Sequence, residues 1–307
     1  MNNYKSNSSE IHEDEIDFNL IFQILWLNKW IICSITTFFA IASLIYSFSL
    51  PNIYQSKSLL SPVDQNNGIS QAMKNYGGIA SIAGISLPQS AGGKTAEAVE
   101  KIKTLSFFEN QILPNIFLPD LMAVDSWDAS SNKIIYNNDL FNEETKSWVS
   151  PSLIPSSQKS FETFKRSMNV SENRDTGFVS IFVKHKSPLI AKELSEIIVN
   201  ELNQFYRLKD KQEAQAAMIY LNSQMAQTSL AEVKQVIAAL LQQKIQQTTL
   251  IEANKFYIFS FIDPPAVMEK KSEPSRATIC ILGTILGLII GMIVVLGRYY
   301  YDKKILN

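Results

Sequence analysis

Only one short run in this 307-residue chain resembles a site for nucleotide chemistry. Gly92-Gly93-Lys94-Thr95 matches the end of the phosphate-binding loop G-x-x-x-x-G-K-[ST], in which backbone amides and a lysine hold the phosphates of a nucleotide. The pattern needs glycine at position 88, where this chain has Pro88, and no apolar strand precedes it. We therefore interpret the run as a flexible loop in which Thr95 caps the following helix.

The histidines and carboxylates form no better catalytic or metal-binding pattern. His12 lies in an acidic N-terminal segment, and His185 ends a predicted strand. Neither is part of a Cys/His/Asp cluster with metal-ligand spacing, and no Gly-x-Ser-x-Gly motif positions a nucleophile. We interpret neighbouring carboxylates such as Asp125 and Asp128 as solvated loop charges. The sequence therefore predicts a protein without catalytic residues, metal ligands or a cofactor.

Two hydrophobic segments near the chain ends are the strongest pattern. Trp30–Leu50 and Ala277–Gly297 contain no charged residue, and each is long enough to cross a bilayer core of ~30 Å as a helix. The acidic residues before the first segment differ from the short basic start of a signal peptide, so we expect a retained anchor. Two spans would place both termini on one side of the membrane and residues 51–276 on the other. Positive charge near the second segment is similar on its two flanks and does not assign the sides.

Charge and cysteine content narrow the class of the middle region. Pro51–Arg276 has 23 basic and 23 acidic residues, so a basic nucleic-acid-binding surface is not indicated. Cys33 and Cys280 both lie in the hydrophobic segments, which leaves the middle without a disulfide framework. The middle is long enough to bury a core of its own.

Strand and helix patterns alternate through this middle region and predict an α+β fold. Loose alternation predicts strands at Ile53–Ser61, Gly177–His185 and Tyr257–Ile262. Asp64–Gly93 is rich in Gly, Ser, Asn and Gln, which is typical of loops. Pro264–Arg276 contains three prolines and is predicted to be an extended connector into the second span.

A long helical tract separates the last two predicted strands. Ser187-Pro188 is a typical helix start, and no Gly or Pro interrupts Leu189–Asp263. A break near Thr228 would divide residues 188–255 into two helices, the first about 60 Å long at ~1.5 Å per residue. Two arrangements stay open. The hairpin either packs on the sheet or stands out from the membrane.

The second hydrophobic segment carries glycines in a regular register. Gly283, Gly287 and Gly291 form two overlapping GxxxG units, which place three glycines on one helix face. Such a face allows close helix approach where lipid supplies no hydrophobic driving force. Its partner is the Ser43/Ser47 face of the first span, another subunit or a separate membrane protein.

The motifs at both ends together resemble the polysaccharide co-polymerase, or chain-length determinant (Wzz), family. The resemblance rests on two groups of residues. Near the first span they are Ile16-Asp17, Trp26-Leu-Asn-Lys29-Trp30 and Leu50-Pro51-Asn52-Ile53-Tyr54, and near the second they are Asp263-Pro264-Pro265, Pro274-Ser-Arg276 and the glycine face. This chain departs from the family at Met268, where a further proline is frequent, and at Asn28, where arginine is frequent.

The resemblance implies a membrane topology and a domain organisation. It implies a two-pass protein of the bacterial inner membrane with a cytoplasmic tail and juxtamembrane helix at 1–29 and a second cytoplasmic tail at 298–307. The spans would be 30–50 and 277–297. Residues 51–276 would be periplasmic, an α/β base domain with the long helices and the connector 264–276.

The resemblance also implies a function and partners. Family members assemble as homo-oligomeric rings and, without an active site, govern how many repeat units a membrane polymerase adds to a lipid-linked glycan. We expect a regulator of O-antigen-type lipopolysaccharide chain length. The alternative is an inner-membrane component of a capsule or exopolysaccharide export machine. A two-span sensor is disfavoured because only ten residues follow the second segment.

Overall fold

The computed structural model describes residues 18–63 and 92–306, which divide into two compact units. The first unit, called the terminal unit, takes its residues from Met1–Pro51 and Pro274–Asn307. The second, the middle unit, takes them from Asn52–Glu273. His12, Pro88 and nearly all of the predicted loop Asp64–Gly93 lie outside the described residues.

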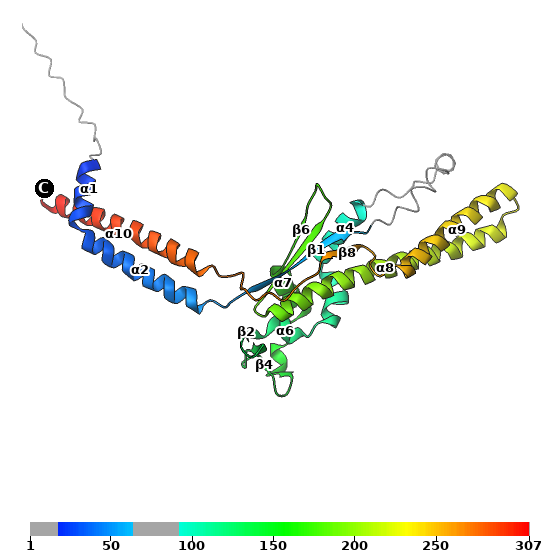
Figure 1. Ribbon diagram of the computed structural model, residues 1–307, viewed down its shortest axis with the longest axis horizontal. Helices are drawn as coiled ribbons and strands as arrows, with labels where there is room; N and C mark the ends of the chain where they lie inside the picture. Colours follow the sequence, from blue (N-terminus) through cyan, green and yellow to red (C-terminus); the bar gives the residue numbers. More distant parts are fainter. Residues whose placement is uncertain (1–17, 64–91, 307) are drawn as a thin grey trace, which may run out of the picture. The chain divides into compact units, whose positions relative to one another are not determined.

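The terminal unit consists of three helices. They are α1 (Phe18–Leu27), α2 (Lys29–Ser49) and α10 (Arg276–Leu306), and α2 and α10 lie side by side (Figure 1). Within α2 and α10, the stretches Lys29–Ser49 and Arg276–Tyr299 are long and apolar enough to cross a membrane. α1 lies within the segment predicted to hold a juxtamembrane helix, and a turn at Asn28 separates it from α2.

A four-stranded antiparallel sheet is the centre of the middle unit. Its strand order is β6 (Met168–Glu172), β7 (Val179–His185), β1 (Tyr54–Pro62) and β8 (Phe259–Asp263). The register of β1 and β7 pairs Tyr54 with His185 and Leu60 with Val179. Alternate residues of both inner strands are buried, as expected for a sheet with one covered face. The three predicted strands are therefore confirmed within a few residues of their predicted limits.

The long helix α8 (Pro188–Gln227) covers that buried face with its first half. Ile190, Leu194, Ile198 and Leu202 are almost inaccessible to solvent and join the core of the sheet. After Ala214 no residue of α8 is buried, and α9 (Ala231–Ala253) folds back along this second half (Figure 1). The first half of α8 packs on the sheet, as in one of the two arrangements left open by the sequence, and its second half forms the hairpin with α9. The break near Thr228 is confirmed.

Shorter elements complete the middle unit around the sheet. Phe108 lies in the core with its ring 5.1 Å from that of Phe164. The helical elements are α4 (Gly92–Ile102), α5 (Leu105–Phe107), η1 (Phe108–Ile112), η2 (Leu113–Asn115), α6 (Leu118–Met122), η3 (Pro151–Leu153) and α7 (Ser157–Ser167). Two small hairpins pair β2 (Val124–Asp128) with β3 (Lys133–Tyr136) and β4 (Phe141–Asn142) with β5 (Ser147–Trp148).

Candidate functional site

The three glycines of α10 lie directly against α2. A Cβ atom built on Gly287 would stand 2.7 Å from the Cβ of Phe39 and 3.1 Å from the Cα of Thr36. A Cβ on Gly283 would stand 2.6 Å from the Oγ of Ser43. Carbon atoms in ordinary contact are ~3.5–4.0 Å apart, so no larger residue fits at these two positions without moving a helix.

The third glycine extends the same contact toward the other end of α2. A Cβ on Gly291 would stand 3.2 Å from the Cα of Ile32, whereas one on Gly297 would have nothing within 4 Å. The partner positions Ser43, Phe39 and Ile32 run down α2 as the glycines run up α10, so the two helices are antiparallel. Of the three partners left open by the sequence, the structure places the Ser43 side of the first span against the glycines.

The hydroxyl groups of Ser43 and Thr36 on α2 are paired within their own helix, whereas that of the buried Ser47 has no hydrogen-bond partner among the described residues. Ser43 Oγ donates to the carbonyl of Ala40 at 2.9 Å, and Thr36 Oγ1 donates to that of Ile32 at 2.8 Å. Both hydroxyl groups therefore already have a hydrogen-bond acceptor on α2 where α10 approaches. The contact is therefore mainly van der Waals packing of the three glycines of α10 against the side chains and backbone of α2, a form of association that suits helices in lipid.

The predicted connector residues fall into both units. Asp263 is the last residue of β8 and pairs with Leu59, and Pro264 and Pro265 follow it directly. The segment then returns beside the start of β1, where the amide of Ile53 donates to the carbonyl of Glu273 at 2.9 Å. Lys184 Nζ lies 2.5 Å from a carboxylate oxygen of Glu273. The segment that was predicted as an extended connector is thus fastened to the sheet at both of its ends.

Pro274 and Arg276 lie in the terminal unit. Arg276 is the first residue of α10, and its guanidinium carbon lies 4.8 Å from the centre of the Phe48 ring. Pro274 lies two residues before the helix, where its missing N–H removes no intrahelical hydrogen bond.

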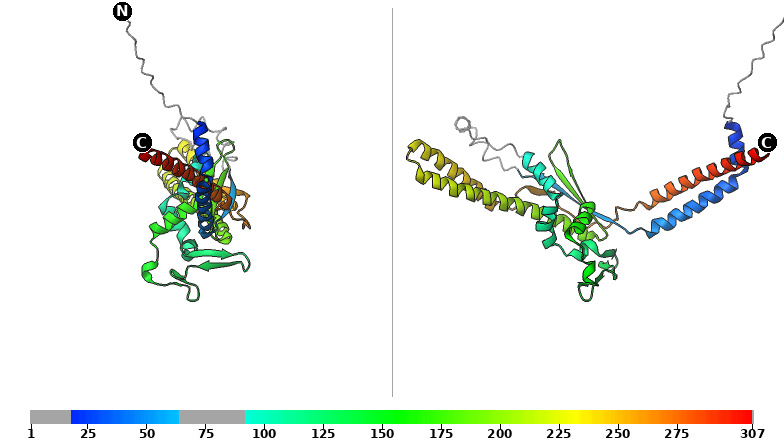
Figure 2. Two further views of the ribbon diagram at one scale, coloured as in Figure 1. Left: turned by 90° about the vertical axis from the view of Figure 1, so that its left-hand side faces the viewer. Right: turned by 180° about the vertical axis from the view of Figure 1, so that it is seen from behind.

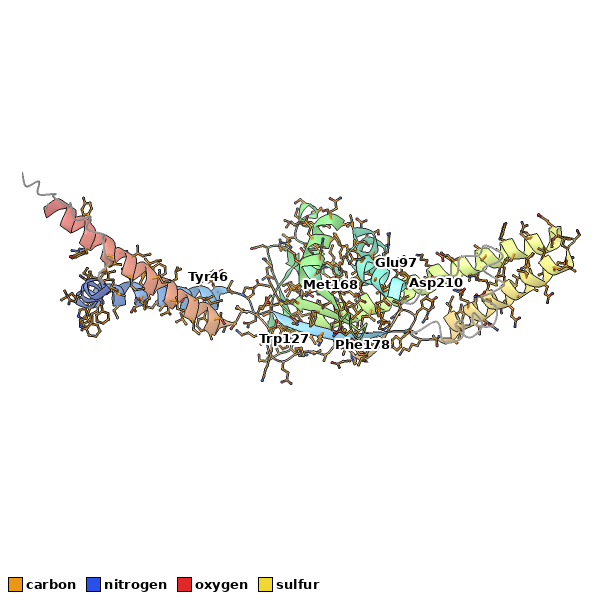
Figure 3. The ribbon with its side chains drawn as sticks, turned by 90° about the horizontal axis from the view of Figure 1, so that it is seen from above. Tyr46, Glu97, Trp127, Met168, Phe178 and Asp210 are labelled. Atoms are coloured by element: carbon orange, nitrogen blue, oxygen red, sulfur yellow. The ribbon has the colours of Figure 1, made fainter. Side chains whose placement is uncertain are left out.

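A buried polar network lies where the α8–α9 hairpin leaves the sheet. Asp210 is 6% exposed and accepts hydrogen bonds from Lys94 Nζ at 2.6 Å and from the Tyr257 hydroxyl at 2.5 Å. Figure 3 shows Asp210 on α8 near Glu97 of α4. The network joins α4, α8 and the segment before β8, and it supplies partners to the buried carboxylate of Asp210, which burial would otherwise destabilise.

Lys94 therefore has a structural role in the described chain. Gly92-Gly93-Lys94-Thr95 forms the first turn of α4, so the expected flexible loop is wrong at these residues. Thr95 lies inside that helix and is 5% exposed, so it does not cap it. The lysine that a nucleotide would require is used in the ion pair with Asp210.

Asn203, nearly two helical turns before Asp210, fixes the start of β8. Its side-chain Oδ1 accepts from the backbone amides of Tyr257, Ile258 and Phe259 at 2.8–3.0 Å. Its Nδ2 donates to the carbonyl of Phe259 at 3.0 Å. Arg207 adds bonds to the carbonyls that follow α9, at Asn254 and Lys255. α8 therefore positions the returning chain by side chains as well as by apolar packing.

Three further titratable groups among the described residues have local hydrogen-bond partners. His185 is buried, its Nδ1 accepts from the Ser187 amide at 3.1 Å, and burial lowers its pKa to about 4. Burial raises the pKa of Asp120, which accepts a hydrogen bond from Tyr136. Bonds from Ser131 and Ser130 lower the pKa of the exposed Asp128 to about 2. Among the described residues, no group of three or more His, Cys, Asp or Glu side chains is placed to hold a metal ion.

Comparison with known proteins agrees with the motifs at the N-terminal end. Residues 14–112 match the family model "Wzz: Chain length determinant protein". The chain resembles the chain-length determinants. The match includes α1, α2 and β1, hence the first span and the first strand of the sheet.

Solved structures of similar proteins have also been found. A full-length bacterial polysaccharide co-polymerase is 15% identical, with a TM-score of 0.41, and the match covers 94% of this chain and 99% of the other. A fragment of WzzB, a polysaccharide co-polymerase from Salmonella Typhimurium, is 12% identical with a TM-score of 0.30, covering 72% and 100%. No curated protein sequence matches this chain.

Proposed function

We propose that this protein is a non-catalytic regulator of polysaccharide chain length, acting on O-antigen-type lipopolysaccharide. The observation that carries the proposal is the glycine-packed pair of apolar helices, formed by the two ends of a chain with chain-length determinant motifs. Such a pair anchors a middle domain to a membrane without adding chemistry of its own. The protein would bias when a membrane polymerase releases the lipid-linked glycan.

The proposed topology follows from the two spans. α2 and α10 cross the bacterial inner membrane, both termini are cytoplasmic, and residues 51–276 form the periplasmic domain. The candidate spans lie at opposite ends of the chain, and the middle unit contains the only sheet that the described residues form with more than two strands. The domain limits 1–29, 30–50, 277–297 and 298–307 belong to this same proposal.

The outer half of the hairpin supports assembly with further copies of the chain. Four large apolar side chains there are well exposed, namely Ile219 (72%), Tyr220 (63%), Leu230 (60%) and Ile245 (56%). Large exposed apolar surfaces are typical of interaction sites. We propose that the protein is a homo-oligomeric ring in which neighbouring hairpins cover these residues.

The test is a gel ladder of surface lipopolysaccharide from a strain that lacks the gene. The gene is restored as wild type, as Gly287→Leu or as the matched control Gly297→Leu. Wild type and the control should convert a broad ladder into a cluster of bands around one length, and Gly287→Leu should lose the cluster. A ladder that never changes would contradict the proposal.

A capsule or exopolysaccharide export component is the second candidate function. The same two-span organisation would serve such a machine. In that case long glycan would disappear from the surface without the gene, whereas a length regulator leaves glycan present but unclustered. The gel separates the two functions when it is read beside an assay of surface capsule and exopolysaccharide from the same strains.

A further inference from the structure

The short helix α1 carries an apolar face that the described chain leaves uncovered. Its sequence, FNLIFQILWL, contains no charged residue. Ile24 is buried, in keeping with the contact between α1 and α10. On the other side, Phe22, Trp26 and Leu27 are 64%, 62% and 81% exposed. These three residues are called the α1 face below.

The position of α1 along α10 coincides with the end of the apolar segment. Ile32 of α2 lies against Gly291 of α10. Because the two helices are antiparallel, Asn28, four residues before Ile32, lies near the level of Val295, four residues after Gly291. Val295 is 2% exposed, and Arg298 soon after it is the first charged residue beyond the apolar run. The C-terminal end of α1 therefore lies where α10 changes from apolar to charged.

The helix axis breaks between α1 and α2. The Asn28 side chain donates through Nδ2 to the carbonyl of Ile24 at 3.0 Å and so pairs a carbonyl at the end of α1. Figures 1 and 2 show α1 turned away from the line of α2 and placed across the end of α10. The break allows the α1 face to lie beside the spans at one level of the membrane.

The chemistry of this face matches the boundary between lipid and water. The rings of Phe22 and Trp26 stack with their centres 6.0 Å apart, and Lys29 Nζ lies 5.0 Å from the Trp26 ring. Tryptophan collects at the level of lipid headgroups, where its ring is apolar and its N–H remains hydrated. A lysine beside it extends its ammonium toward water and anionic headgroups.

We infer that α1 is an interfacial helix whose face of Phe22, Trp26 and Leu27 lies in the headgroup–acyl boundary of a lipid bilayer. The inference rests on the proposed function, in which α2 and α10 cross that bilayer. Lipid is the occupant because the face continues directly into Trp30, which is 76% exposed on the first turn of the span. α1 then fixes the depth of the helix pair, since Ile24 ties it to α10 while its other side lies in the interface.

Site-directed spin labelling tests this placement. Cys33→Ala and Cys280→Ala remove both native cysteines, and single cysteines are then placed at Phe22, Ile24 or Trp26. Each labelled full-length protein is reconstituted in vesicles of phosphatidylethanolamine and phosphatidylglycerol. Collision rates with oxygen, which is concentrated in lipid, and with a water-soluble nickel complex are compared. Ile41 of α2, 53% exposed, reports the span, and the exposed Ala129 of the middle unit reports water.

Labels at positions 22 and 26 should show an oxygen-to-nickel ratio several-fold above that at 129, and the label at 24 should collide slowly with both. A ratio at 22 and 26 equal to that at 129 places the face in water and overturns the inference. Slow collision with both reagents at 22 and 26 also overturns it, because a protein partner or second copy then covers the face. If position 41 is lipid-exposed in these cases, the two-span proposal stands. If position 41 is also in water, both fail.

Discussion

The replacement of Gly287 by a larger residue should separate α2 from α10. An alanine Cβ would stand 2.7 Å from the Cβ of Phe39 and 3.1 Å from the backbone Cα of Thr36. Contact at ~3.8 Å therefore requires a local shift of about 1 Å, and a backbone atom cannot turn aside as a side chain can. Overpacking of this kind typically costs about 1–3 kcal/mol. Leucine adds three more carbon atoms and should move the helices farther.

Pulsed electron resonance between two spin labels measures this separation in the membrane. Cysteines replace Ile41 and Ile285, which are 53% and 50% exposed, in a chain without Cys33 and Cys280. Labelled protein is diluted with unlabelled protein so that distances within one chain dominate. The mean distance should lengthen by about 1 Å for Gly287→Ala and by more for Gly287→Leu.

Gly297 supplies the matched control on the same helix. A Cβ at Gly297 meets nothing within 4 Å, so Gly297→Ala and Gly297→Leu should leave the distance unchanged. Alanine is also the better helix former by ~1 kcal/mol, which makes this control favourable rather than neutral. An unchanged distance in Gly287→Leu would refute the reasoning, because it would mean that α2 does not lie against the glycines in the bilayer.

Two further predictions concern the middle unit. Asn203→Ala should lower the free energy of unfolding by about 3 kcal/mol or more, because three backbone amides lose their buried acceptor. The matched control is Gln204→Ala at the exposed neighbouring position, which should leave this free energy unchanged. Chemical denaturation of the full chain in detergent measures both variants. His185→Asn should remove a pH dependence. The pKa of His185 is about 4 in the folded protein and 6.5 in the unfolded chain. The group therefore contributes about 3 kcal/mol of stability above pH 6.5, and this contribution is lost as the pH falls toward 4. The free energy of unfolding, measured at both ends of this pH window, tests the prediction. The raised pKa of Asp120 acts in the opposite direction in both proteins, so the difference between them isolates His185.

Repeated patterns allowed the helix pair and the sheet to be predicted. Trp30–Leu50 and Ala277–Gly297 are uninterrupted apolar runs, and a strand such as Val179–His185 alternates along its length. Each pattern reflects one environment, lipid or a buried sheet face, that is repeated over many residues. Many residues therefore indicate the same element, which makes its prediction reliable. The register of the glycines identified the face of α10, although only coordinates showed which residues of α2 meet it.

Single polar residues at the hairpin base could not be identified in this way. Asn203 and Asp210 are seven residues apart and follow Leu202 and Lys209 on a helix whose apolar residues recur at three or four. Seven residues are nearly two helical turns, so both face the same side as the core. A polar pair on that side was a usable signal. The partners of Asp210 are Tyr257 and Lys94, which lie 47 and 116 residues away from it in the sequence. No local spacing indicates contacts over such separations.

The contacts at the base of the α8–α9 hairpin indicate how rigidly the hairpin is joined to the sheet. α8 joins the sheet core through Ile198 and Leu202 and continues without a break into the hairpin. Asn203 and Asp210 tie that same stretch to the segment before β8, and β8 leads through Pro264 and Pro265 toward α10. A displacement of the hairpin would therefore act on β8 through paired buried groups, whose separation costs more than bending an exposed loop. Under the proposed function, this continuity favours a rigid scaffold over a hinged one as the element that sets glycan length.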